Sequence, residues 1–213
     1  MSGSKSRFPR HGRNVKRNGR KRAKRYLVVC GGEVTETQYF EHIRNILDDV
    51  VISVRSKART PAQLAEFAVS CKTDDARDDS TDHYAEVFVV VDVDDFHDHN
   101  RAQRICKEHG IRLVISNPCF EVWLVDHVRS CPESYTVTAD VERYAAQLGV
   151  TKGSRDKYID FSKIDGHMDD AITNAGKHNT SERQKARNLL AFGKENDYAP
   201  WTDMPDVVQT IKQ

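Results

Sequence analysis

The sequence lacks the features of a membrane-spanning or secreted protein. No apolar run is long enough to cross a bilayer, and the N-terminus carries no hydrophobic segment of the signal-peptide type. The five cysteines are an odd number, are widely spaced and form no CxxC pair, which argues against a disulfide framework or a zinc site. We therefore expect a cytoplasmic protein with reduced thiols and no membrane contact.

Acidic residues are missing from the first 25 positions. This segment holds 11 Lys and Arg, so residues 26–213 keep 22 of the 33 basic residues against all 32 acidic ones. The net charge of +1 therefore hides a basic N-terminal arm and an acidic body. Because polar residues, Gly and Pro dominate the arm, we expect residues 1–25 to be disordered.

A basic arm of this kind is typical of a segment that binds the phosphate backbone of RNA or DNA, with an affinity that depends on salt and not on sequence. The alternative is a solubilising or folded-back tail that neutralises the acidic body. The candidate nucleic-acid contacts near the end of the arm are Lys21, Arg22, Lys24 and Arg25.

Residues 26–130 alternate between short apolar runs and amphipathic stretches. The runs, typical of buried strands, are 26–30, 50–54, 87–92 and 111–115. Helical spacing connects them over about 35–48, 61–71 and 100–109, with Thr35 and Thr60 as expected N-caps. This alternation calls for βαβ crossovers, so we predict an α/β fold with a mostly parallel four-stranded sheet flanked by helices.

Beyond Pro118 the pattern turns helical. Helices are expected over 120–128, 138–148 with Thr138 as cap, 159–175, 181–192 and 206–212. We therefore predict one domain, 26–213, in which a sheet-bearing core (26–130) is followed by a mainly helical C-terminal extension (131–213).

The third apolar run ends in a cluster of carboxylates. Asp92 and Asp94 lie on the same side of an extended chain, and two carboxylates that close repel unless a cation lies between them. Ligand sites in parallel sheets lie at the carboxyl ends of the strands. Those ends carry the segments 31–33 (GGE), 92–94 (DVD) and 116–118 (SNP), so we expect a site where they meet.

Three segments together resemble the RloB-like proteins, a branch of the Toprim fold associated with phage defence and abortive infection. They are 30–40 (CGGEVTETQYF), 87–96 (VFVVVDVDDF) and 116–127 (SNPCFEVWLVDH). The resemblance runs from about Tyr26 to the C-terminus and implies a Toprim-like core over 26–130. The third segment is its most specific part, because a DxD motif alone recurs in many unrelated enzymes.

The resemblance implies a Mg²⁺ or Mn²⁺ site that acts on phosphodiester bonds. Toprim enzymes hold Mg²⁺ with a DxD after the third strand, which carries over to Asp92 and Asp94, with Asp95 in reserve. A hard divalent cation suits this chemistry, since it takes oxygen ligands and neutralises phosphate charge.

Toprim enzymes also use a Glu after the first strand, as general acid/base or further metal ligand. Gly31 stands at the usual position in this sequence, so Glu33 and Glu36 remain as candidates. Glu36 lies near a helix N-terminus, which tends to lower the pKa of a carboxyl group and suits a metal ligand. Each glutamate also has a structural interpretation, as a loop residue or a residue of the first helical turn.

Four further residues are candidates, each with a structural alternative. Glu121 stands in an apolar segment, where an unpaired carboxylate is costly, so we place it among the catalytic residues. Lys157 is a candidate phosphate contact, or an exposed lysine. Asn117 and His127 are possible supporting residues, or else a turn former before Pro118 and a core histidine.

The resemblance favours a Mg²⁺-dependent nuclease that cleaves RNA, tRNA included, or DNA in a prokaryotic antiviral system. It implies an ABC-type or AAA-like ATPase encoded nearby as partner, and a homo-oligomer is possible. The alternative is a non-catalytic regulatory subunit that binds nucleic acid or the ATPase, and a nucleotide-binding sensor is a third hypothesis. Gly31 favours the regulatory alternative, whereas the DxD motif and Glu121 oppose it.

Overall fold

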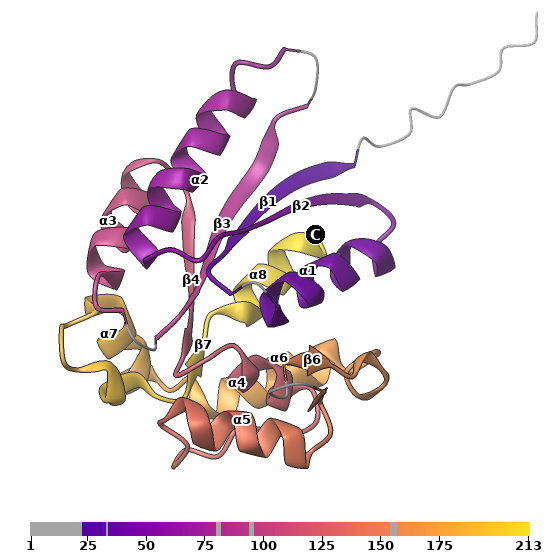
Figure 1. The fold of residues 1–213 in the computed structure, drawn as a ribbon, viewed down its shortest axis with the longest axis vertical. Helices are drawn as coiled ribbons and strands as arrows, with labels where there is room; N and C mark the ends of the chain where they lie inside the picture. The colour runs from indigo at the N-terminus through magenta and orange to yellow at the C-terminus, as the bar shows by residue number, and fades with distance from the viewer. Residues whose placement is uncertain (1–22, 33, 80–81, 94–95, 154–156) are drawn as a thin grey trace, which may run out of the picture.

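The chain forms three layers, with a β-sheet between two groups of helices (Figure 1). The computed structural model describes residues 23–32, 34–79, 82–93, 96–153 and 157–213. Five predicted site residues, and nearly all of the basic arm, lie outside the described residues; those site residues are Lys21, Arg22, Glu33, Asp94 and Asp95.

The sheet has five strands in the order β2-β1-β3-β4-β7. The first four to appear in the chain run parallel to one another, and β7 is antiparallel to β4. The mostly parallel α/β sheet is confirmed, but the count of four strands is wrong. The fifth strand escaped detection because it is only two residues long and forms no apolar run. The strands are β1 (Lys24–Cys30), β2 (Val50–Ser56), β3 (Tyr84–Asp92), β4 (Arg112–Asn117) and β7 (Trp201–Thr202).

The first strand begins earlier than expected and takes two residues from the predicted arm. Lys24 and Arg25 lie in β1. The Arg25 guanidinium donates to the Asp75 carboxylate at 2.9 Å and to the carbonyl of Asp82, and it lies 4.6 Å from the centre of the Tyr84 ring. These contacts attach Arg25 to the start of β3 and the end of α2 and give it a structural role.

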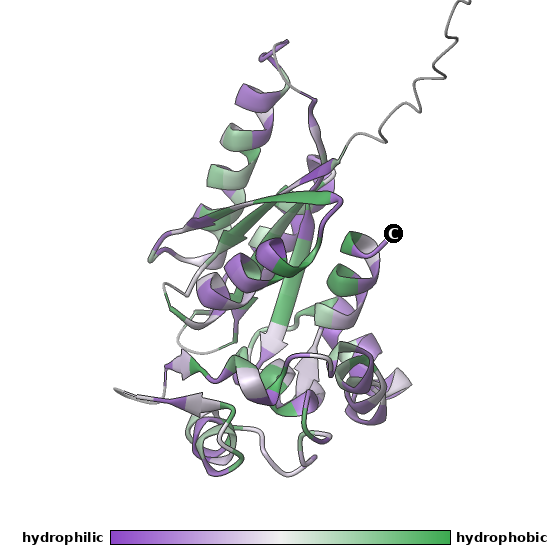
Figure 2. Ribbon diagram, turned by 90° about the vertical axis from the view of Figure 1, so that its right-hand side faces the viewer, coloured by the Kyte–Doolittle hydropathy of each residue, from purple (hydrophilic) through white to green (hydrophobic). Residues whose placement is uncertain are grey.

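Helices cover both faces of the sheet. One face carries α1 (Thr35–Ile46), α4 (Glu121–Asp126) and α8 (Met204–Ile211); the other carries α2 (Pro61–Asp75) and α3 (His99–Glu108). Alternate residues of β1 therefore enter two different cores: Val28 packs with Phe40, and Val29 packs with Leu64. A strand buried on both faces is apolar throughout, as the hydropathy colouring in Figure 2 shows.

The C-terminal part is mainly helical but holds a short hairpin, β5 (Thr151–Lys152) and β6 (Tyr158–Ile159). The helix expected over 159–175 is wrong in its first half. The Asp160 carboxylate accepts from the amide of Ser162 and starts a 3-10 turn (Phe161–Lys163), and Gly166 reverses the chain at φ 80°. The remaining helices are α5 (Thr138–Gln147), α6 (Met168–His178) and α7 (Ser181–Leu189), and a second 3-10 turn covers Glu195–Tyr198.

The order of the strands creates a crevice between β1 and β3. The chain leaves β1 through α1 on one face and reaches β3 through α2 on the other face. At such a switch point the two connections diverge, and the carboxyl ends of the adjacent strands are left accessible to a ligand. No helix in the described part of the chain is long and apolar enough to cross a membrane.

Candidate functional site

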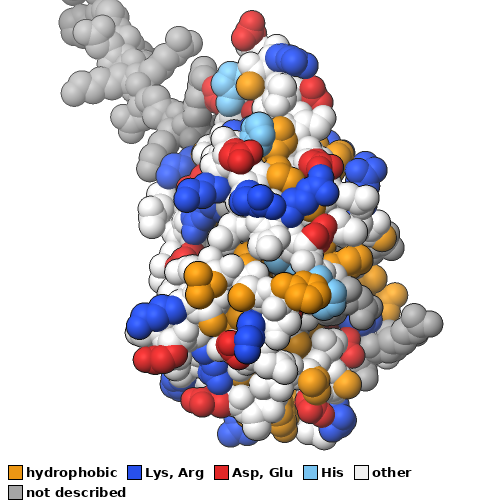
Figure 3. All heavy atoms as spheres, turned by 90° about the vertical axis from the view of Figure 1, so that its left-hand side faces the viewer, with side chains coloured by type: hydrophobic (Ala, Val, Ile, Leu, Met, Phe, Trp, Pro, Cys, Tyr) orange, Lys and Arg blue, Asp and Glu red, His pale blue; other side chains and the backbone are white. Residues whose placement is uncertain are grey.

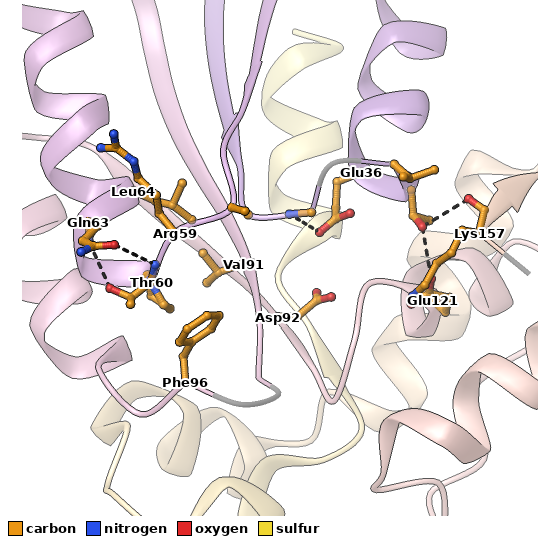
Figure 4. A pocket seen from close by; sticks show the side chains of 16 residues that line it. Glu36, Arg59, Thr60, Gln63, Leu64, Val91, Asp92, Phe96, Glu121 and Lys157 are labelled. Atoms are coloured by element: carbon orange, nitrogen blue, oxygen red, sulfur yellow. Dashed lines mark hydrogen bonds and ion pairs between the residues drawn. The ribbon is translucent and has the colours of Figure 1, made fainter. Parts of the chain in front are cut away.

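A cleft of about 650 Å³ opens at the carboxyl ends of β1 and β3, at the switch point of the sheet (Figure 4). One wall carries acidic groups from the starts of α1 and α4 and the end of β3. The opposite wall comes from the start of α2 and the segment after β3. The residues that line the cleft include Gly31, Gly32, Thr35, Glu36, Arg59, Thr60, Gln63, Asp92, Phe96, Glu121 and Lys157.

Glu36 folds back over the glycines that end β1. Its Oε1 accepts a hydrogen bond from the amide of Gly32 at 3.1 Å. A Cβ at position 32 would lie 1.9 Å from the other carboxylate oxygen, so a side chain there would displace the carboxylate. The absence of a side chain at Gly32 therefore allows the Glu36 carboxylate to reach the cleft.

Burial dominates the electrostatics of Glu36, which is 4% exposed. Burial raises the pKa of this carboxyl group to about 7; the charge of Glu121 adds to the rise, and hydrogen bonds from the backbone and the charge of Lys157 oppose it. The lowered pKa expected from the helix N-terminus is wrong, because loss of hydration outweighs the helix dipole.

Glu36 makes the stability of the metal-free protein depend on pH. Since the folded state keeps the Glu36 proton up to about pH 7 and the unfolded chain loses it near 4.5, the free energy of unfolding falls as pH rises through this window. In the wild type this fall in the free energy of unfolding should amount to about 3 kcal/mol, and Glu36→Gln should abolish it. Urea unfolding in EDTA at several pH values measures the free energy of unfolding of both proteins.

The matched control is Glu41→Gln, an exposed glutamate on the same helix. Its pH profile should run parallel to that of the wild type. If the profile of Glu36→Gln also runs parallel, Glu36 does not hold its proton in the folded state.

Asp92 is the last residue of β3, and the backbone around it is fixed. His99 Nε2 lies 2.8 Å from the carbonyl oxygen of Asp92, and the amide of Val93 donates to the carbonyl of Ser116 at 3.1 Å. The side chain points into the cleft, on the side of Glu36 and Glu121 (Figure 4). Asp94 and Asp95, expected to complete the carboxylate cluster, lie outside the described residues.

Two buried thiols lie beneath this acidic wall. Burial raises the pKa of Cys30, and the charges of Glu36 and then Asp92 add to it. Burial likewise raises the pKa of Cys119, with additions from Glu121 and Asp92. Both cysteines therefore remain neutral thiols, and Asp92 lies close enough to each of them to raise its pKa.

Glu121 begins α4 and is 2% exposed. Its Oε1 accepts from the Thr35 hydroxyl at 3.3 Å and lies 3.8 Å from the Lys157 ammonium. Lys157 also donates to Glu142 at 2.6 Å. Burial lowers the pKa of Lys157, but the charges of Glu121 and Glu142 raise it by more than burial lowers it. The net shift is upward, so the lysine stays charged. Lys157 thus neutralises Glu121, and its contact with phosphate remains a prediction.

The donor set of the cleft fits a hydrated Mg²⁺ or Mn²⁺. Within the described residues, no three or more His, Cys, Asp or Glu side chains are grouped so as to hold a metal ion. Mg²⁺, however, keeps several waters and commonly takes only one or two protein carboxylates. Glu36 and Asp92 supply two hard oxygen donors to the same cleft, and a bound cation would favour the charged form of Glu36, whose pKa is raised mainly by burial and further by the charge of Glu121.

Two predicted supporting residues lie away from the cleft. The Asn117 amide donates to the carbonyl of Glu195 at 2.8 Å and so holds the 3-10 turn before β7. His127 is buried, with Nδ1 3.0 Å from the carbonyl of Trp123, and burial lowers its pKa to about 4. Both have structural contacts where the structure places them, and neither lines the cleft.

Sequence reasoning missed the wall opposite the acidic groups. Arg59 and Thr60 reach the cleft from the loop before α2, and Phe96 reaches it from the segment after β3. The available signal was the run RSKAR at 55–59, which places three basic residues directly after an apolar strand.

The fold and the cleft together define an α/β protein with a carboxylate-lined site at the switch point of a mostly parallel sheet. Residues 26–211 match the family model described as RloB-like protein, so the chain belongs to the RloB-like family. A search of curated proteins finds no match to this chain.

Proposed function

We propose that the protein is a Toprim-type, divalent-metal-dependent nuclease that cleaves phosphodiester bonds of RNA or DNA. The observation that carries this proposal is the convergence of Glu36 and Asp92 in one cleft at the carboxyl ends of β1 and β3. A buried carboxylate and a half-buried one that face the same cleft favour a site that works on a cation and an anionic substrate together.

The residues of the cleft have different roles in the proposed mechanism. Asp92 and Glu36 would hold the metal ion, which would supply neutralisation of phosphate charge and activation of water. Gly32 keeps the Glu36 carboxylate in place through its amide. Lys157 prevents Glu121 from adding a full negative charge, and Arg59 attracts the phosphate from the opposite wall.

Membership of the RloB-like family supports a role in a prokaryotic antiviral system, beside an ABC-type or AAA-like ATPase. The second candidate function is a regulatory subunit that binds nucleic acid or that ATPase without cleaving. Gly31 favours it, because this position after β1 is where a Toprim nuclease most often carries its Glu.

Cleavage assays on a panel of substrates test the nuclease. Purified protein is incubated with total tRNA, plasmid DNA and single-stranded DNA, in Mg²⁺, in Mn²⁺ and in EDTA, with and without the neighbouring ATPase. We expect cleavage of at least one substrate that stops in EDTA. Cleavage that persists in EDTA contradicts the metal mechanism, and binding without cleavage in every arm favours the regulatory subunit.

The basic arm supplies a separate prediction. Deleting residues 1–22, which leaves β1 intact, should weaken binding to polyanions and flatten the dependence of affinity on salt. The reason is that a protein with fewer phosphate contacts releases fewer counterions when it binds. Titrations of labelled DNA at several salt concentrations measure both quantities. Unchanged affinity and slope would mean that the arm does not contact nucleic acid.

A further inference from the structure

Phe96 is an exposed ring inside the cleft. Its side chain lies on the wall opposite Glu36, next to Thr60, and 38% of the residue is accessible (Figure 4). Leu64 and Val91 of the cleft are buried, and Val34 at its rim is as exposed as Phe96 but carries no ring. An aromatic face that is left open beside acidic groups is suited to a flat ligand that covers it.

A second exposed ring, Phe192, lies outside the cleft. His97 meets Phe192 edge to face, with ring centres 5.2 Å apart, and its Nδ1 lies 3.5 Å from the Glu195 carboxylate. Phe192 is 74% exposed. The protein therefore presents two accessible aromatic rings: Phe96 in the cleft, and Phe192 outside it against the residue that follows Phe96.

Positive charge borders the same wall. Lys57 Nζ and Arg59 Cζ lie over the ring of Phe67, 4.0 and 5.9 Å from its centre. Neither residue has an ion pair with the described part of the chain. Figure 3 views the side of the molecule that carries α2 and α3, where a band of Lys and Arg side chains crosses above a group of hydrophobic side chains and a histidine.

We propose that the cleft binds a single-stranded nucleic acid, with its backbone along Lys57 and Arg59, an unpaired base stacked on Phe96, and Phe192 as a second stacking position. The proposal rests on the proposed nuclease function and specifies its substrate. Phosphate attraction combined with ring stacking is how proteins hold single strands without reading their sequence. A duplex keeps the faces of its internal bases covered, so only its two ends could stack on Phe96 and it should bind more weakly.

Fluorescence anisotropy in EDTA, where metal-dependent cleavage is silent, tests this. The probes are a labelled single strand of about 12 nucleotides, as DNA and as RNA, and the matching duplexes. We expect the wild type to prefer the single strand. Phe96→Leu, which keeps the apolar bulk, should weaken single-strand binding about 5- to 100-fold, and Phe96→Tyr should retain it.

The matched control is Leu189→Ala, because Leu189 is 75% exposed and makes no ring contact. It should bind like the wild type. The stacking proposal is overturned if duplex and single strand bind equally, or if Phe96→Leu binds as tightly as the wild type. It is also overturned if Leu189→Ala loses as much affinity as Phe96→Leu, because that result would indicate a general apolar surface such as a protein-docking site.

The two proposals fail in different ways. If Phe96→Leu weakens binding as expected but no substrate is cut in metal, the nuclease function fails and the single-strand site stands. If cleavage depends on metal but Phe96→Leu binds normally, only the stacking proposal fails. If no nucleic acid binds at all, both fail.

Discussion

Asp92→Asn slows cleavage of the best substrate by at least about 100-fold under the proposed function. The amide keeps the shape of the side chain but removes the negative charge, and Asp92 is the residue at the end of β3 that points into the cleft (Figure 4). Because Asn has nearly the same size and shape as Asp, the substitution should leave the fold unchanged. The rate is measured with labelled substrate in saturating Mg²⁺.

The control for Asp92 is Asp74→Asn, at an exposed aspartate near the end of α2 that lies 3.8 Å from Arg77. This variant should cleave at the wild-type rate. A rate in Asp92→Asn within a few-fold of the wild type would remove Asp92 from the mechanism.

The second large effect concerns the position of α4, the helix that begins with Glu121. His178 of α6 and Asp126 of α4 form a fully buried pair, with Nε2 and Oδ2 2.9 Å apart. Burial raises the pKa of Asp126, and the hydrogen bond and charge of His178 oppose that rise. His178→Ala leaves the carboxylate buried with one partner fewer and opens a cavity, so we expect a loss of about 3 kcal/mol or more.

Urea unfolding, followed by the fluorescence of the two buried tryptophans, Trp123 and Trp201, measures this loss. The matched control is His167→Ala, which removes an exposed contact to Asp170 at 2.8 Å and should cost at most about 0.5 kcal/mol. Equal stability of the two variants would mean that the buried pair does not hold α4 to α6.

The sheet was predictable because parallel strands buried on both faces read as continuous apolar runs. Thr60 caps α2 as predicted, with its hydroxyl accepting from the amide of Gln63. Thr35 does not cap α1; its hydroxyl donates to Glu121, which lies 86 positions away in the chain. Thr138 likewise forms no cap bond. Local rules identify a cap when its partner is local, and fail when a distant residue competes.

The candidate site was predictable in part. Asp92 follows from the rule that ligands gather at the carboxyl ends of strands, and Glu121 from the cost of a carboxylate in an apolar segment. The raised pKa of Glu36 was not predictable, because it arises from burial that only the tertiary fold creates. Phe96 was missed for the same reason, since no periodic pattern marks a ring that faces a cleft.

The binding of Mn²⁺ tests the central claim most directly, because it needs neither the natural substrate nor an activating partner. Electron paramagnetic resonance counts free Mn²⁺ during titration of the wild type, Asp92→Asn, Glu36→Gln and Asp74→Asn. The account predicts a saturable site in the wild type and Asp74→Asn, with weaker binding in Glu36→Gln and none in Asp92→Asn. Equal binding by the wild type and Asp92→Asn, or no binding by the wild type, would contradict it.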